Sequence, residues 1–166
     1  MYQAEGDAAS VQGTTKVERT EREIIVTRTF DAPARLVFDA WTKPELFKRW
    51  WAPRSLGMHL RSVELDVRTG GTYRLEFGED PASSMAFFGK YIEVVPNSKI
   101  VWTNDEGGDE GSVTTVTLEE QDGQTLLTFR EHYPSKEALE ANAGAEGAMP
   151  EQFDQLDELL ASMPAN

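Results

Sequence analysis

Three of the chain's four tryptophans fall within one short stretch, residues 31–53, and no other feature constrains the fold as strongly. Trp41, Phe47, Trp50 and Trp51 place four large rings in this stretch, among several charged residues. A pair of short helices cannot cover so much aromatic surface, so we expect a strand before the stretch and a sheet after it. The rings then either fill a core or line a cavity.

Length and composition predict one domain. The chain has 166 residues, of which 39% are hydrophobic, which suits a single core. Residues 1–21 are polar, and we expect a disordered arm there, followed by one domain over residues 22–163. The sequence has no cysteine, no apolar run near the ~20 residues that cross a bilayer and no signal-like start, so we expect a cytoplasmic protein.

The charge balance argues against two classes of partner. The formal net charge is −13, from 29 acidic and 16 basic residues, and the basic residues form no dense patch. Nucleic acid and anionic membrane surfaces would both be repelled. We therefore expect neither as a partner.

Alternating apolar residues predict a strand over residues 23–30, and 3.6-residue spacing predicts two short helices after it. Asp31 is either the N-cap of the first helix or the start of a turn before Pro33, and Pro44 opens the second helix. Arg28 shares the parity of Val26, so a buried Arg28 needs a carboxylate or carbonyl partner, and a structural ion pair is the first interpretation.

The rest of the chain predicts a meander of strands and then a long helix. Six further strands are expected, over residues 60–68, 72–77, 85–95, 100–104, 112–119 and 125–133. Ser135 can cap a short helix, and Met149, Phe153, Leu156, Leu160 and Met163 form the apolar stripe of a C-terminal helix. The expected fold is α+β, with about seven antiparallel strands curved around this helix. A helix across a curved sheet cannot fill the groove, so we expect an internal cavity.

Little in the sequence indicates chemistry. His59 and His132 are the two histidines, neither has a partner at metal-ligand spacing, and no dinucleotide or phosphate motif occurs, so we expect neither metal nor cofactor. Weak catalytic candidates are His132, Glu131 and Tyr73, which could polarise a carbonyl. Glu131 and His132 are adjacent on a strand and must point to opposite faces, which argues against one compact site.

The aromatic residues are the stronger signal for function. As a set they exceed the needs of a thin core, which favours a cavity for a small apolar or aromatic molecule. Arg28, Tyr73 and Tyr91 could supply polar contacts. The candidate ligand-binding residues are Arg28, Phe47, Trp50, Trp51, Tyr73, Phe77, Phe88, Tyr91, Trp102, Phe129, Met149 and Phe153. Trp50 and Trp51 are adjacent, so one is expected to pack inside and the other to approach the pocket mouth, with the choice left open.

Several short motifs, in this order, resemble the helix-grip proteins of the START and Bet v 1 superfamily, in particular the domain similar to the activator of Hsp90 ATPase. The resemblance covers Glu23 to about Ser162. It rests on residues 28–33, 41–46 and 50–53, on Asp66, Arg68, Gly70 and Gly71, on Gly89, Tyr91, Glu93 and Pro96, and on residues 101–103. Such domains usually open the last helix with a Gly and Trp pair, whereas this chain has Gly147 and Ala148, so Met149 or Phe153 takes the tryptophan's place.

The resemblance implies a helix-grip fold and a hydrophobic cavity. Its members include stress-related cochaperone domains, polyketide cyclase-like proteins and binders of lipids or small molecules. We therefore expect a ligand-binding protein without clear catalytic machinery. An Hsp90-type cochaperone and a cyclase-like enzyme are the alternatives, and both a monomer and a homodimer remain open.

Overall fold

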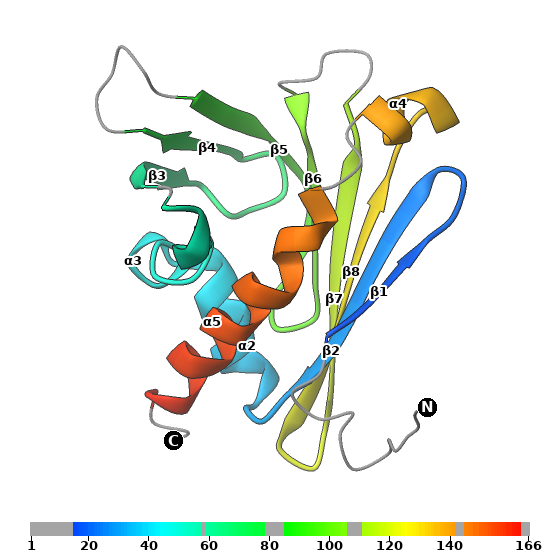
Figure 1. Ribbon diagram of the computed structural model, residues 1–166. Coiled ribbons are helices and arrows are strands. Elements are labelled where there is room, and N and C mark those ends of the chain that lie inside the picture. The colour runs from blue at the N-terminus through cyan, green and yellow to red at the C-terminus, as the bar shows by residue number, and fades with distance from the viewer. Residues whose placement is uncertain (1–14, 58, 79–84, 106–110, 142–144, 164–166) are drawn as a thin grey trace.

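The computed structural model describes residues 15–57, 59–78, 85–105, 111–141 and 145–163. They form an α+β structure in which one antiparallel sheet curls around a C-terminal helix (Figure 1). The eight strands pair in the order β1-β2-β8-β7-β6-β5-β4-β3. The predicted fold class is confirmed.

The strands match the predicted meander closely. Their bounds are β1 Lys16–Arg19, β2 Glu23–Phe30, β3 Leu60–Leu65, β4 Thr72–Phe77, β5 Met85–Val95, β6 Lys99–Thr103, β7 Val113–Gln121 and β8 Gln124–His132. Consecutive strands pair from β3 to β8, as is usual for strands that follow one another in sequence. The last strand, β8, then pairs with the early strand β2, in a register that sets Val26 opposite Phe129.

The structure corrects the predicted N-terminal arm. Residues Lys16–Arg19, expected to be disordered, form the edge strand β1 and pair with Ile24 to Thr27 of β2. This strand raises the count from the expected seven to eight. All four of its residues are exposed, so it lacks the apolar alternation by which a strand is recognised in a sequence. Residues 1–14 of the predicted arm lie outside the described part.

The helices also follow the predicted order. They are α2 Ala34–Thr42, α3 Pro44–Phe47, α4 Lys136–Ala141 and α5 Met149–Ala161, with short 3₁₀ helices at Arg54–Leu56 and Ala145–Ala148. Asp31 does not cap α2: the Ala34 amide donates to the Glu120 carboxylate of β7 at 2.8 Å. The second helix is shorter than expected, because turns replace it after Phe47. Ser135 does cap α4, since its hydroxyl oxygen accepts from the Ala138 amide.

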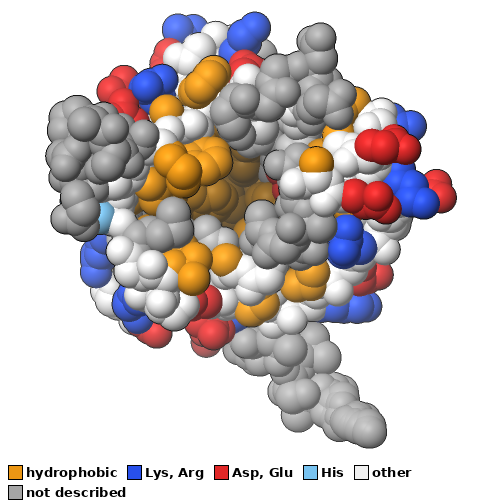
Figure 2. Space-filling model, turned by 45° about the horizontal axis from the view of Figure 1, so that its top comes forward, with side chains coloured by type: hydrophobic (Ala, Val, Ile, Leu, Met, Phe, Trp, Pro, Cys, Tyr) orange, Lys and Arg blue, Asp and Glu red, His pale blue; other side chains and the backbone are white. Residues whose placement is uncertain are grey.

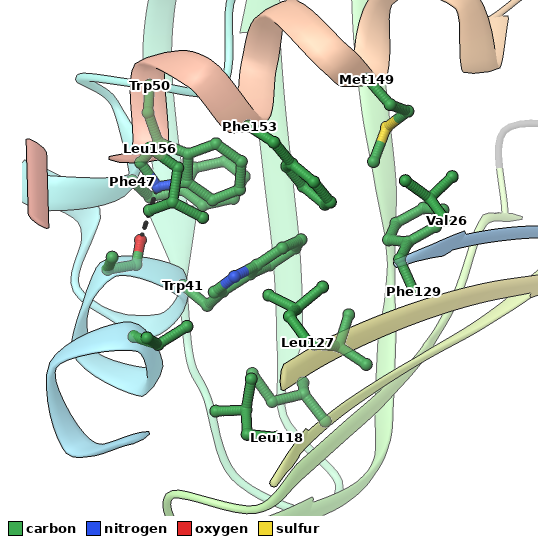
Figure 3. Packing of buried hydrophobic residues seen from close by; sticks show 14 of the residues in the cluster. Val26, Trp41, Phe47, Trp50, Leu118, Leu127, Phe129, Met149, Phe153 and Leu156 are labelled. Carbon is green, nitrogen blue, oxygen red and sulfur yellow. Dashed lines mark hydrogen bonds between the residues drawn. The ribbon is translucent and has the colours of Figure 1, made fainter. Parts of the chain in front are cut away.

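The core lies between α5, α2 and the concave face of the sheet. Phe153 and Leu156 of α5 point toward Trp41 of α2 and Leu127 of β8 (Figure 3). Figure 1 shows α5 crossing the open side of the curved sheet, with α2 and α3 beside it at one end. Among the described residues, no helix is both long enough and apolar enough to cross a bilayer.

An ion pair fastens α5 to the sheet. The Arg28 side chain, buried on β2, donates to Asp154 at 2.6 Å and to Asp157 at 3.2 Å, one helical turn apart on α5. The predicted structural ion pair is therefore present. Arg28 also donates to the Thr15 hydroxyl at 3.1 Å, so its guanidinium is committed to the structure rather than to the groove.

Candidate functional site

A cavity of about 370 Å³ lies between the sheet and the helical side of the molecule. Figure 2 shows it as a hollow in the surface, with hydrophobic side chains gathered around and inside it. In the described part of the chain, ten aromatic side chains line it: Trp41, Phe47, Trp51, Tyr73, Phe77, Phe87, Tyr91, Trp102, Phe129 and Tyr133. The remaining lining residues are Pro53, Leu56, Leu65, Leu75, Ile100 and Ala148, with the polar Asn104, Thr114, Glu131 and Gln152.

Trp41 joins the core to the wall of this cavity. Its ring is 4.7 Å from that of buried Trp50, measured between centroids. On the cavity side its centroid lies 5.9 Å from Trp51 and 5.8 Å from Trp102. Aromatic pairs at such spacings attract through their quadrupoles, so the wall is held in shape by ring packing.

The structure decides between the two adjacent tryptophans. Trp50 is fully buried, and its indole nitrogen donates to the Ala40 carbonyl at 2.9 Å (Figure 3). Trp51 is half-buried, stacks on Phe47 at 4.9 Å and lines the cavity. Trp51 is thus the member of the pair that approaches the pocket.

Two glutamines of α5, which the sequence analysis missed, hold the turn that carries Trp51. The Gln155 amide nitrogen donates to the carbonyls of Trp50 and Ala52, each at 3.0 Å, and its oxygen accepts from the Arg54 amide at 2.9 Å. Gln152 donates to the Trp51 carbonyl. Both side chains are buried, and they supply hydrogen-bond partners for backbone groups of this turn.

One end of the cavity wall is polar. The Tyr73 hydroxyl donates to the Thr103 carbonyl at 2.8 Å and lies 3.1 Å from the Asn104 side-chain oxygen. The Asn104 nitrogen donates to the hydroxyls of Ser112 and Thr114, each at 3.0 Å. The Ser112 hydroxyl in turn donates to Glu131 Oε2 at 2.7 Å. Five side chains, from β4, β7, β8 and the connection between β6 and β7, therefore form one network that ends on the Glu131 carboxylate.

Tyr91 contributes a neutral ring to the same wall. Burial raises the pKa of Tyr91 above its ordinary value of 10.0, and the negative charge of Asp66 raises it further. Its ring centroid lies 5.7 Å from that of Tyr73. The phenol therefore stays uncharged throughout the physiological pH range.

Seven of the predicted ligand-binding residues line the cavity and five do not. Those on the wall are Phe47, Trp51, Tyr73, Phe77, Tyr91, Trp102 and Phe129. Trp50, Met149 and Phe153 are buried in the core, and Arg28 is held by its ion pair. The predicted place of these four at the cavity is wrong, because packing or pairing within the fold occupies each of them.

Phe88 is also wrongly placed by the sequence analysis. It lies on the outer face of β5, with the Arg74 guanidinium over its ring at 5.8 Å, and its neighbour Phe87 lines the cavity instead. Leu75 of β4 pairs with Phe87, and Tyr73 pairs with Gly89, so Phe87 shares the inner face of these residues. Strand parity with Tyr91 could have identified Phe87.

The catalytic candidates separate as strand alternation predicted. Glu131 lines the cavity, whereas His132 is exposed on the other face, 3.4 Å from Glu23. His59 is exposed as well. Within the described ranges, no three His, Asp or Glu side chains are grouped so that they could hold a metal ion. Of the three candidates, Tyr73 and Glu131 therefore share the cavity, and His132 is excluded from it.

Comparison with known proteins places this fold in a family. Residues 31–161 match the family described as Activator of Hsp90 ATPase homolog 1-like protein. No curated protein matches the chain.

Three solved structures illustrate the similarity. A Rhodobacter sphaeroides protein is 21% identical, with a TM-score of 0.80 over 90% of this chain and 99% of its own. A Staphylococcus epidermidis protein is 28% identical, with a TM-score of 0.72 over 88% and 93%. An AHSA1-like protein from Aeromonas hydrophila is 18% identical, with a TM-score of 0.62 over 81% and 94%. The similarity to the Rhodobacter sphaeroides and Aeromonas hydrophila proteins shows a shared fold only.

Proposed function

The chain belongs to the Activator of Hsp90 ATPase homolog 1-like family, and on this premise we propose that it binds a small hydrophobic or aromatic molecule in the cavity. Folds of this kind commonly hold hydrophobic ligands. The ligand would enter through the hollow of Figure 2 and lie against the rings of α2, α3 and the inner sheet.

The cavity itself is the observation that carries this proposal. Protein interiors are close-packed, and an opening of about 370 Å³ surrounded by ten rings lies in the ~300–1,000 Å³ range of small-molecule sites. Removing ~100 Å² of apolar ligand surface from water contributes about 2.5 kcal/mol before the costs of association. Burial of apolar surface would thus supply most of the affinity.

A cavity-filling variant tests the proposal. Leu75, buried on β4, lines the cavity, and Leu75→Trp would occupy part of its volume. Leu126→Trp adds the same ring at an exposed position of β8 and serves as the matched control. Isothermal titration with neutral aromatic ligands should give saturable binding to wild type and Leu126→Trp and much weaker binding to Leu75→Trp. Equal affinities of the three proteins, or no saturable binding at all, would refute the proposal.

The inward position of Glu131 favours one second candidate, a cyclase-like enzyme. A carboxylate on the wall could accept a proton from a bound carbonyl compound. Tyr73 is a poor proton donor for such a reaction, because its hydroxyl already donates within the wall. Turnover of a polyketide-like substrate that Glu131→Gln abolishes would support this candidate, and absence of turnover by wild type would eliminate it.

A further inference from the structure

Among the described residues, one acidic side chain and no basic one line the cavity. All 16 Lys and Arg residues and both His residues of the sequence lie in the described part of the chain, and none of them lines the cavity. Glu131 is the one acidic lining residue within the same ranges. The whole protein carries a formal net charge of −13, so the surroundings reinforce a negative potential rather than offsetting it.

The Glu131 carboxylate is fixed in position by the wall. Ser112, itself only 4% exposed, donates to Oε2 at 2.7 Å, and Asn104 in turn donates to the Ser112 hydroxyl. Each polar group of this network orients the next, which prepares the carboxylate in advance for a partner. A charged acceptor held this way makes stronger hydrogen bonds than a neutral one.

An aromatic residue and the carboxylate lie on either side of a small residue in the sheet. In the sheet register Trp102 of β6 pairs with Thr114 of β7, and Thr114 pairs with Glu131 of β8. The three therefore form one row on the inner face, where strands are spaced by about 4.8 Å. Thr114 is short and lines the cavity, so the space over it separates the Trp102 ring from the carboxylate. Phe129, two residues from Glu131 on β8, borders the same space.

From this arrangement we infer that the occupant is a hydrophobic amine, bound as its ammonium ion, an inference that rests on the proposed function. The apolar part of the ligand packs on the rings. Its ammonium group lies over Thr114, where it pairs with Glu131 and meets the electron-rich faces of Trp102 and Phe129. Aromatic rings attract such cations, and the attraction grows as water is removed. A carboxylate ligand of the same shape meets like charge and is rejected.

Three ligands of one shape and different charge test the inference: 2-naphthylmethylamine, 2-naphthylmethanol and 2-naphthoate, titrated calorimetrically at pH 7. Wild type is compared with Glu131→Gln, which keeps the size of the side chain and removes its charge. Glu119→Gln, at an exposed position of β7, makes the same change of net charge away from the cavity. Thermal unfolding confirms that each variant is folded.

We expect wild type and Glu119→Gln to bind the amine at least about tenfold more tightly than the alcohol, and the naphthoate most weakly. In Glu131→Gln the affinities of amine and alcohol should differ by less than about twofold. If Glu131→Gln does not fold, the order of the three affinities in wild type decides. Alcohol binding as tight as amine binding, or an amine preference that persists in Glu131→Gln, overturns the inference and leaves the proposed function standing. Absence of binding by all three overturns both.

Discussion

The indole nitrogen of Trp50 donates a hydrogen bond to the carbonyl oxygen of Ala40 at 2.9 Å, which ties the turn after α3 to the last part of α2. This bond turns the Trp50 ring into the core. The next residue, Trp51, packs edge-to-face on the Trp50 ring at 5.4 Å between centroids and forms part of the cavity wall. Adjacent residues of the same type thus have different roles.

Substitution of the two tryptophans should separate stability from binding. Trp50→Phe loses the hydrogen bond and leaves a void in the core, so we expect the free energy of unfolding to fall by about 2–4 kcal/mol. Trp51→Phe should cost less than about 1 kcal/mol, since Trp51 is half-buried at the cavity, but should weaken ligand binding. Urea unfolding and calorimetry measure the two effects. Equal losses of stability would contradict the different roles.

Removing Arg28 should destabilise the fold less than removing its two carboxylate partners. The Arg28 side chain is only 3% exposed, whereas those of Asp154 and Asp157 are 65% and 42% exposed. Arg28→Met releases carboxylates that water can solvate, so we expect a loss of less than about 2 kcal/mol. The double variant Asp154→Ala, Asp157→Ala strands a buried cation and should cost about 3 kcal/mol or more. Urea unfolding of both variants checks the order, and the reverse order would contradict it.

Glu151 should make stability depend on pH in the acid range. Hydrogen bonds from the Ser55 hydroxyl and then from the Ser55 amide lower the pKa of Glu151 below its ordinary value of 4.5. The stabilisation is therefore complete above pH 4.5 and is lost as the pH falls from 4.5 through the lowered pKa. In thermal unfolding from pH 6 to pH 3, the advantage of wild type over Glu151→Gln should shrink toward low pH.

Ser55→Ala is the control for this pH effect. It removes the hydroxyl donor and keeps the backbone donor, so its pH dependence should lie between those of wild type and Glu151→Gln. An advantage of wild type over Glu151→Gln that stays constant across the acid range would contradict the assigned role of Ser55.

Much of the fold could be predicted because strand and helix periods are local properties. The bounds of β4 and β5 and the stripe of α5 follow from alternation and 3.6-residue spacing. The capping of α2 by Glu120 could not be predicted in this way, since that carboxylate lies 86 residues away from Ala34. The edge strand β1 was missed because its exposed residues have no apolar pattern.

The site was harder to predict, because aromatic residues serve both core and cavity. The number of aromatic residues predicted a cavity. It could not distinguish Phe153, which is buried against Phe30, from Trp102, which lines the cavity. That distinction depends on where α5 crosses the sheet. The buried glutamines of α5 were missed for a related reason, since their partners are backbone groups of a distant turn.

Gly89 should tolerate no side chain. A Cβ atom at Gly89 would lie 1.9 Å from the Thr103 carbonyl oxygen, a backbone atom of the neighbouring strand. We expect Gly89→Ala to lower the free energy of unfolding by about 3 kcal/mol or more. Gly147→Ala, where a Cβ meets nothing within 4 Å, should change it by less than about 1 kcal/mol. Urea unfolding of the pair measures the contrast, and a mild effect at Gly89 would contradict the close strand contact.

The most direct test of the central claim is a nuclear magnetic resonance titration with 2-naphthylmethanol. The chain has four tryptophans, so four indole N–H signals report on the core and on the wall. Ligand binding in the cavity predicts saturable shifts of the Trp51 and Trp102 signals, while the Trp50 signal, hydrogen-bonded to Ala40 in the core, stays in place. Signals that do not move, or that drift without saturation, would show that the cavity does not bind this class of molecule.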